Sequence, residues 1–388
     1  MNPTILDLGT LGMDEGAHLL VQRALVQGPV AVRGDHPALA VHLRAWARAH
    51  GHGFRLGNEA CYLTPSLATR TTGAEPAGRP EPAGIVDHPP AHWGFAARGA
   101  RVEIGTHPIT FALHEKDVVW SDEIPRLYAQ AAAGQWDPAT AIPWDAPLSH
   151  PDAVEEAVVQ LMTYLIENET AALLVPARFL GQTHPHFREV MQLLAIQCAD
   201  EARHIEVFTR RATLRRTTLG LSTAGGQASL ETLLTEPDFA LASFLLSVLG
   251  EGSFLALLRF LAEHAPDLIT RAVCRLSSQD EARHVAFGVA HLQRHARLDP
   301  TLHARLAAAV HRRHDALRHT AGLNAEVFDA LVLIAAGSFD VAPIRRGWRL
   351  VLDLLDEMDH GRRVRLGLLG FPPSEAEALS ALHTRNFM

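Results

Sequence analysis

The sequence predicts a mainly α-helical protein: an antiparallel four-helix bundle with additional C-terminal helices, preceded by a small α/β domain. Three observations support this prediction. Apolar residues recur with a helical period from about residue 151 onward. Before residue 64, short apolar runs alternate with amphipathic stretches. The segment between these parts is rich in proline and glycine, which favours connecting structure over core elements.

Residues 1–63 are predicted to form the small α/β domain, with strands at 5–8 and 29–32 and helices at 16–26 and 37–50. The stretch at 6–12 resembles the start of the small sulfur-carrier domain, in which a Cys-Pro pair opens the first helix. Met13 and Asp14 stand in place of that pair here. Because the thiol is missing, we expect no persulfide chemistry and interpret this domain as a scaffold or docking module.

Residues 64–150 are predicted to be a linker and wrapping segment. Its first part, 64–105, is dense in Pro, Gly and Ala. Its second part carries Trp120, Trp136 and Trp144 among several prolines. We expect this second part to pack across the outside of the helical domain that follows.

Residues 151–388 are predicted to form the helical domain. Its connections are short, long and short, with the long one broken at the Gly225-Gly226 pair, which describes an antiparallel bundle with one crossover. The expected helices are four long ones at about 152–180, 185–212, 238–263 and 266–295, and further ones at about 301–318, 324–337, 343–364 and 373–384.

The third long helix is apolar enough to raise the question of a membrane span. It carries Glu251 at its centre and Arg259 near its end, and both would be costly in lipid. We therefore expect this helix to be buried inside the bundle and expect no membrane association.

The pentapeptide Asp-Glu-Ala-Arg-His occurs twice, at 200–204 and at 280–284. Each copy places a Glu and a His three residues apart, on nearly one face of a helix. The pairs are Glu201 with His204 and Glu281 with His284. A carboxylate and an imidazole side by side are two ligands of a metal site, and two such helices supply most of a dinuclear one.

The remaining carboxylates follow from hairpin geometry. In an antiparallel hairpin, the residue at the same height lies about 30 positions upstream. Counting back from Glu281 reaches Glu251, and counting back from Glu201 reaches Glu169. Glu167 competes for the last position, but helical phase favours Glu169, which shares the apolar stripe. Four carboxylates and two imidazoles suit two first-row metal ions bridged by carboxylate.

An isolated Glu-x-x-His pair is usually a solvated pair on a helix surface. Here the pair is duplicated, and each copy has a Glu upstream inside an apolar helix, where an unpaired charge would cost roughly several kcal/mol. This context favours a metal site over the surface alternative.

With these residues, the chain resembles the ferritin-like di-iron carboxylate superfamily over about 151–295. The paired pentapeptide is most similar to its oxygen-activating branch, which includes bacterial monooxygenase hydroxylases and acyl-carrier desaturases. The resemblance implies that Asp200 and Asp280 each accept the free ring N–H of the histidine on the opposite helix. It also implies that Arg203 and Arg283 hold these two carboxylates in place.

The chain departs from particular relatives. Arylamine N-oxygenases, which the stretch at 136–145 resembles, carry an extra His ligand where this chain has Ser277. The monooxygenase hydroxylases have a Thr where Leu255 stands here. Two glycines flank Glu251, which indicates either a local bulge at the site or close helix packing.

The resemblance implies a non-haem di-iron oxygenase or oxidase that activates O₂ to oxidise a small organic substrate, by hydroxylation, N-oxygenation or desaturation. The expected cofactor is two Fe ions, with Mn/Fe possible on the same ligands. No flavin or nicotinamide fingerprint occurs, so electrons should come from an external reductase or ferredoxin. The alternatives are a ferroxidase, peroxide-scavenging or iron-handling protein, and a binding or assembly protein that works through its α/β domain.

Composition limits the other functions. The 388 residues carry 35 basic and 43 acidic side chains, and the net charge of −8 argues against nucleic-acid binding. Three scattered cysteines form no disulfide framework and favour the cytoplasm. The N-terminal stretch lacks a basic segment followed by an apolar run, so we expect no signal peptide. We also allow for a homodimer.

Overall fold

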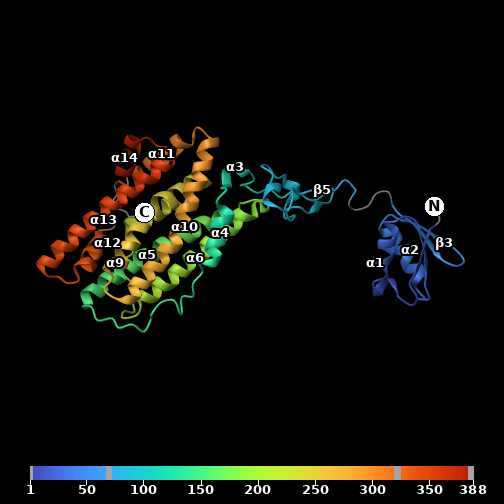
Figure 1. Cartoon of the computed structure of the whole chain (residues 1–388), viewed down its shortest axis with the longest axis horizontal. Coiled ribbons are helices and arrows are strands. Elements are labelled where there is room, and N and C mark those ends of the chain that lie inside the picture. Colours follow the sequence, from blue (N-terminus) through green and yellow to red (C-terminus); the bar gives the residue numbers. More distant parts are fainter. Residues whose placement is uncertain (1–2, 67–71, 319–324, 383–388) are drawn as a thin grey trace. The chain divides into compact units, whose positions relative to one another are not determined.

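The computed structural model describes residues 3–66, 72–318 and 325–382. The chain divides into two compact units (Figure 1). One comprises Met1–Gly84 with Ala96–His107, and the other comprises Ile85–Phe95 with Pro108–Met388.

The first unit contains a four-stranded sheet with two helices and a hydrophobic core of its own, in which Val21, Leu43 and Leu63 are fully buried. The strand order is β1-β2-β4-β3, with β1 and β2 parallel and the other pairs antiparallel. The elements are β1 (Thr4–Asp7), α1 (Ala17–Leu25), β2 (Val30–Arg33), α2 (Leu39–Ala49), β3 (Gly53–Leu56) and β4 (Cys61–Thr64). Further along, β5 (Glu75–Pro76) pairs with β6 (Arg101–Val102).

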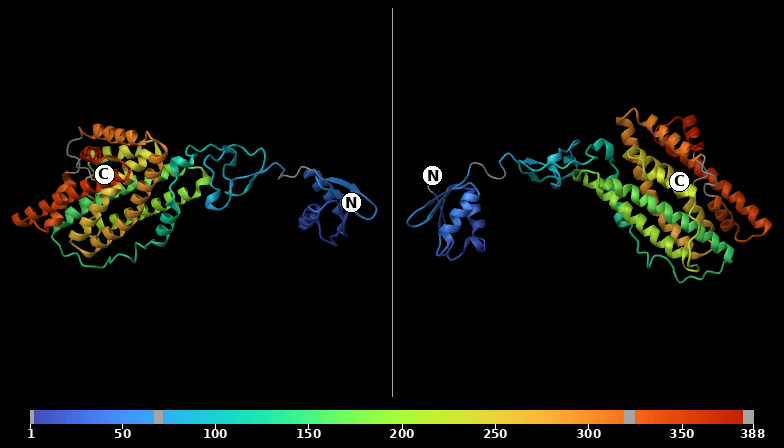
Figure 2. Two further views of the ribbon diagram at one scale, coloured as in Figure 1. Left: turned by 45° about the horizontal axis from the view of Figure 1, so that its top comes forward. Right: turned by 180° about the vertical axis from the view of Figure 1, so that it is seen from behind.

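The second unit is built around four long antiparallel helical segments, and the predicted mainly α-helical fold is confirmed (Figures 1 and 2). Neighbouring segments pack as pairs, α5 with α6 and α9 with α10, and α6 also packs against α10. The segments are α5 (Asp152–Leu180), α6 (Arg188–Ala212), the continuous run α8 (Phe239–Ser243), η5 (Phe244–Glu251) and α9 (Gly252–His264), and α10 (Leu268–Leu298).

A buried ion cluster ties three of these helices together at one end of the bundle. The Arg211 side chain at the end of α6 is fully buried and donates two hydrogen bonds of 2.9 Å to Glu155 of α5. It donates a third, of 2.8 Å, to Asp267, whose other carboxylate oxygen caps α10 by accepting from the backbone N–H of Thr270. This pairing gives every charge in the cluster a partner, as burial requires.

The long connection between α6 and α8 corrects one prediction. The Gly225-Gly226 pair does not break a helix but begins one, α7 (Ala224–Leu234). The hydroxyl of Thr223 accepts from the backbone N–H of Gly226, so the helix starts at a capping residue that we did not assign.

The segment predicted as linker and wrap contains two short helices, α3 (Lys116–Val119) and α4 (Ile124–Ala133), and α4 packs against α6. After the bundle come the additional C-terminal helices, of which α12 packs against α5 and α13 against α9. Their bounds are α11 (Leu302–Leu317), α12 (Ala325–Ala336), α13 (Val341–Leu368) and α14 (Pro373–Ala381).

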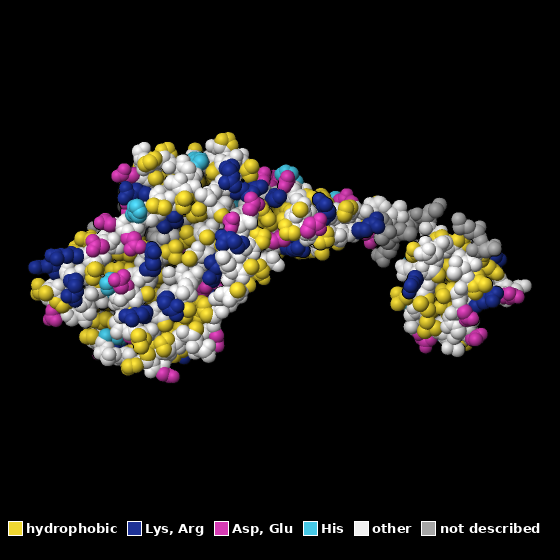
Figure 3. Space-filling model, in the orientation of Figure 1, with side chains coloured by type: hydrophobic (Ala, Val, Ile, Leu, Met, Phe, Trp, Pro, Cys, Tyr) yellow, Lys and Arg dark blue, Asp and Glu magenta, His cyan; other side chains and the backbone are white. Residues whose placement is uncertain are grey.

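The apolar run Phe239–His264 is long and apolar enough to cross a membrane, but 94% of its most apolar window is buried inside the protein. Taken together, the helices α12 and α13 are also long and apolar enough to cross a membrane, but the chain bends by 120° between them. Burial in the bundle core accounts for the apolar character of Phe239–His264, as the sequence predicted. On the face that Figure 3 shows, acidic and basic side chains are interspersed, as on an ordinary protein surface.

Candidate metal centre

The six side chains that the sequence selects as ligands meet in the middle of the bundle, one or two from each long helical segment. They are Glu169 on α5, Glu201 and His204 on α6, Glu251 at the end of η5, and Glu281 and His284 on α10. None is more than 4% exposed. The hairpin spacing therefore brings all six to one height, inside an apolar core.

The six residues form two overlapping groups, in each of which the potential ligand atoms lie within 4.8 Å of one another. Glu201 and Glu281 belong to both groups, whereas the other four residues each belong to one. The two groups are Glu169, Glu201, His204 and Glu281, and Glu201, Glu251, Glu281 and His284.

The two shared carboxylates are oriented as bridges. Glu201 directs Oε1 toward Nδ1 of His284, at 3.0 Å, and Oε2 toward Nδ1 of His204, at 3.2 Å. Glu281 repeats this arrangement, with its two oxygens 3.3 Å from the same two nitrogens. Each bridge thus offers one oxygen to each of two neighbouring positions, as carboxylates that join two metal ions do.

The structure places Glu169, and not its competitor Glu167, in this cluster. Glu169 is 2% exposed and lies 3.3 Å from Nδ1 of His204. Glu167 is only half-buried and belongs to neither group.

The electrostatics of the cluster fit two cations. Glu169 Oε1, Glu251 Oε2 and both oxygens of Glu201 are buried and accept no hydrogen bond from the described parts of the chain. Burial raises the pKa of Glu169 and of Glu251, and the neighbouring Glu281 raises both further. Burial lowers the pKa of the two histidines, but the surrounding carboxylates outweigh it and raise both. Metal ions would satisfy these oxygens and relieve their mutual repulsion.

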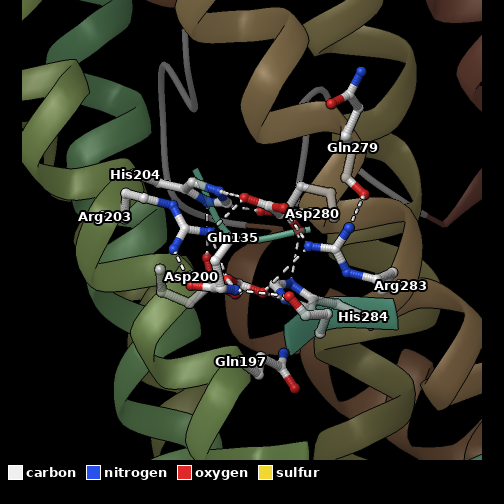
Figure 4. A network of polar contacts seen from close by, with 12 residues as sticks. Gln135, Gln197, Asp200, Arg203, His204, Gln279, Asp280, Arg283 and His284 are labelled. Atoms are coloured by element: carbon white, nitrogen blue, oxygen red, sulfur yellow. Dashed lines mark hydrogen bonds and ion pairs between the residues drawn. The ribbon is translucent and has the colours of Figure 1, made fainter. Parts of the chain in front are cut away.

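Each histidine faces an aspartate of the opposite helix with its other ring nitrogen (Figure 4). His204 Nε2 lies 3.2 Å from Asp280 Oδ2, and His284 Nε2 lies 3.3 Å from Asp200 Oδ2. Burial would raise the pKa of both aspartates, but the histidines outweigh it and lower both. Because the aspartates are therefore acceptors, Nε2 of each ring donates to its aspartate, and Nδ1 would bind a metal ion in place of its own proton.

The two arginines of the pentapeptides join the aspartates to each other. Arg203 Nη2 donates to Asp200 at 2.5 Å and to Asp280 at 2.8 Å. Arg283 Nη2 donates to Asp280 and lies 3.6 Å from Asp200. Both arginines thus contact both carboxylates, and the four charged side chains form one network next to the two histidines (Figure 4).

Sequence reasoning missed several residues that contact this site. Gln197 donates to Glu251 Oε1 at 3.1 Å, and Ser247 also hydrogen-bonds the Glu251 carboxyl. Both could have been found, because each lies four residues before a predicted ligand. Gln135 and Trp136 bind the two aspartates, and only the expected packing of the tryptophan segment pointed toward them.

Both alternatives for the glycines beside Glu251 hold. The run Phe244–Glu251 is a π-helix, which is the local bulge. Gly252 also packs closely, because a Cβ placed there would lie 2.3 Å from Nε of Arg365. This Nε, from α13, donates to the carbonyl of Val248 at 2.6 Å. The additional helix α13 thus supports the π-helix that carries Glu251.

A small cavity of about 20 Å³ lies beside the cluster, between α5, α6, α8, η5 and α10. Gln197 and Ser247 form its wall toward Glu251. Its other lining residues are Val175, Pro176, Phe179, Leu194, Phe239, Ser243, Leu246 and Phe287, and none of the lining residues is charged. The hydroxyl of Ser243 is buried there without a hydrogen-bond partner in the described chain.

No protein-family model and no curated protein sequence matches the chain. Solved structures that resemble it include protein 19 with aldehyde deformylating oxidase activity from Synechococcus, at 20% identity and a TM-score of 0.43. That match covers 59% of this chain and 96% of the other. Another is a variant of R2-like ligand-binding oxidase with a reconstituted Mn/Fe cofactor, at 18% identity and a TM-score of 0.41. It covers 67% of this chain and 94% of the other.

Proposed function

We propose that the chain is a non-haem di-iron oxidase or oxygenase that activates O₂ to oxidise a small organic substrate. The observation that carries this proposal is the orientation of Glu201 and Glu281, each of which offers one oxygen to each histidine. Two redox-active metal ions held between them would supply electrons to O₂. The ligand set accommodates Fe/Fe and Mn/Fe alike.

The residues of the chain have distinct tasks in this proposal. Glu169 with His204 would complete the ligands of one metal ion and Glu251 with His284 those of the other, and Glu201 and Glu281 would be shared by both ions. Asp200 and Asp280 fix the tautomer of the two rings by accepting the Nε2 proton. The apolar walls of the bundle exclude water, which protects a reactive oxidant from side reactions.

The cavity beside Glu251 supports a substrate that is uncharged where it approaches the centre. Its walls carry no charge to pair with a carboxylate or ammonium group, and an unpaired charge there would be strongly disfavoured. A cavity of about 20 Å³ holds little more than one water molecule. A larger substrate therefore requires an apolar side chain such as Leu246 to move.

We further propose that an external reductase or ferredoxin supplies the electrons, and that the protein works in the cytoplasm. The cysteines Cys61, Cys198 and Cys274 are free in the structure, which fits a reducing compartment. The proposal covers hydroxylation, N-oxygenation and desaturation, because a centre of this kind suits all three reactions. A homodimer would contain one such centre in each chain.

Metal analysis tests the proposal. Protein purified and reloaded with ferrous iron without oxygen should hold two Fe per chain and consume O₂ on exposure to air. The Glu201→Ala variant should do neither, because it removes a residue from both metal positions. Wild-type protein that holds only traces of metal and takes up no ferrous iron would refute it.

The narrow cavity favours a second candidate, a ferroxidase or peroxide-scavenging protein, because such a protein needs the same ligands but no room for an organic substrate. O₂ uptake in fixed proportion to added ferrous iron, with iron mineral as the product, would favour this candidate. A rate of O₂ uptake that depends on an added organic compound would favour the oxygenase.

A further inference from the structure

Two adjacent residues, Gln135 and Trp136, reach the candidate centre from outside the four long helices. They follow the C-cap of α4, Gly134, in the chain. Gln135 is an exposed residue and Trp136 is half-buried. Each one nevertheless hydrogen-bonds a different aspartate of the buried cluster, and neither belongs to the repeated pentapeptides.

Gln135 binds the Asp200 half of the cluster (Figure 4). Its Nε2 donates to Asp200 Oδ1 at 2.8 Å, and its Oε1 accepts from Arg203 Nη1 at 2.5 Å. The carboxylate can only accept and the guanidinium can only donate, so the orientation of the amide is fixed by its two partners. A third bond, from Nε2 to the carbonyl of Ala131, anchors it to the last turn of α4.

Trp136 binds the Asp280 half. Its indole N–H donates to Asp280 Oδ2 at 2.8 Å. Its ring lies nearly parallel to that of His204, with 6.5 Å between centroids, and beneath the guanidinium of Arg203, at 4.7 Å. The residue thus supports both the aspartate and the histidine that this aspartate faces.

We infer that Gln135 is a positioning residue for His284, through Asp200, and that Trp136 is the corresponding residue for His204, through Asp280. Two neighbouring side chains then control one metal position each. The inference rests on the proposed metal centre, and it adds that the two positions are separately adjustable from a single segment outside the bundle.

The two halves are not equally secured. Asp280 accepts hydrogen bonds from Trp136, Arg203 and Arg283, and none of the three is longer than 2.8 Å. Asp200 accepts hydrogen bonds from Gln135 and Arg203, whereas the guanidinium of Arg283 lies 3.6 Å from it. Without the amide of Gln135, Arg203 also loses an acceptor, and Asp200 keeps one close donor besides the histidine. The loss of Gln135 should therefore disturb its half more than the loss of the indole N–H disturbs the other.

Two variants and two matched controls test this inference in the full-length protein. Gln135→Leu removes the amide and keeps the bulk, and Trp136→Phe removes the N–H and keeps a ring. Gln130→Leu is the control for the first, because Gln130 lies on α4 and contacts Arg126 instead of the cluster. Trp144→Phe is the control for the second, because its indole N–H donates to the carbonyl of Pro138.

The probe is Co²⁺ alone, added to metal-free protein. Each metal-bound imidazole should give one exchangeable, paramagnetically shifted N–H line in the proton NMR spectrum, assigned with His204→Gln and His284→Gln. Gln135→Leu should displace the His284 line and weaken one of two Co²⁺ affinities about tenfold, the low end of the range for partners of metal ligands. Trp136→Phe should displace the His204 line by less, and the controls should match wild type.

The inference is overturned if both variants leave both lines in place, if each variant displaces both lines equally, or if the controls behave like the variants. Circular dichroism of the metal-free proteins checks that all are folded. Wild-type protein that binds no Co²⁺ would overturn the metal centre itself, and this inference with it. Wild-type protein that binds two, with variants that match it, would overturn this inference and leave the metal centre standing.

Discussion

Replacing Glu251 by glutamine should remove one metal position and leave the other. Glu251 belongs to one of the two ligand groups, whereas Glu201 belongs to both. Glutamine keeps the volume of the side chain and an oxygen that can accept from Gln197. Burial raises the pKa of Glu251, so its neutral form is already favoured without metal and the amide should not destabilise the metal-free fold.

The size of the effect follows from linkage. A metal ion supplied at about 100 times its Kd stabilises the native state by about 2.7 kcal/mol, so two ions supply about 5.4 kcal/mol. For a protein of this size, 1 kcal/mol corresponds to roughly 2 °C in Tm or less. We expect metal to raise the Tm of wild type by at most about 10 °C, that of Glu251→Gln by about half as much, and that of Glu201→Gln by almost nothing.

The assay is calorimetry of metal-free and metal-loaded proteins, with the metal content measured on the same samples. Glu169→Gln should behave like Glu251→Gln, since it removes one residue from the other group. Glu167→Gln is the matched control and should keep both ions. The reasoning is wrong if Glu251→Gln gains as much from metal as wild type, or if Glu167→Gln loses the gain.

Three further predictions concern the surrounding structure. Arg211→Met should lower the free energy of unfolding by about 3–5 kcal/mol, because it removes the guanidinium from two buried carboxylates and leaves Glu155 with His150 alone as an ionisable partner. Burial would raise the pKa of these two carboxyls, but Arg211 outweighs burial and lowers both pKa values. The ionised carboxyls therefore stabilise the fold above the pKa values of the unfolded chain, 4.5 for Glu155 and 3.8 for Asp267, and this stabilisation is lost as the pH falls below those values. Urea unfolding of wild type and variant should therefore differ less at low pH than at pH 7, and an equal difference at both would contradict this. Gly252→Ala should cost about 1–3 kcal/mol through its clash with Arg365, and adding Arg365→Met should recover part of that loss, which thermal melts can show. Deleting the segment from β1 through β4 removes a separate hydrophobic core, so the metal content and O₂ uptake of the remaining chain should be unchanged; loss of both would mean that this part is required for the chemistry.

The sequence located the site through regular geometry. Glu169 and Glu251 could be found because antiparallel hairpins place residues about 30 positions apart at one height. The long helices could be delimited because their apolar faces recur over many turns. The choice between Glu169 and Glu167 depended on helical phase alone, and the burial of Glu169 agrees with that phase.

The remaining features depend on contacts that no local pattern records. Gln135 hydrogen-bonds Asp200, which lies 65 residues later in the sequence, and Trp136 hydrogen-bonds Asp280, which lies 144 residues later. The hairpin of β3 and β4 consists of strands of four residues, too short to show a clear period. The start of α7 was hidden because a glycine pair ordinarily indicates a break, whereas Thr223 caps a helix there.

The central claim is that four carboxylates and two histidines of this bundle hold two metal ions between shared carboxylate bridges. Its most direct test is a titration of metal-free protein with ferrous iron under anaerobic conditions, with bound iron counted per chain in wild type, Glu251→Gln and Glu201→Gln. We predict two tightly bound ions for wild type, one for Glu251→Gln and none for Glu201→Gln. A single ion in wild type, or the same number in all three proteins, would contradict the account.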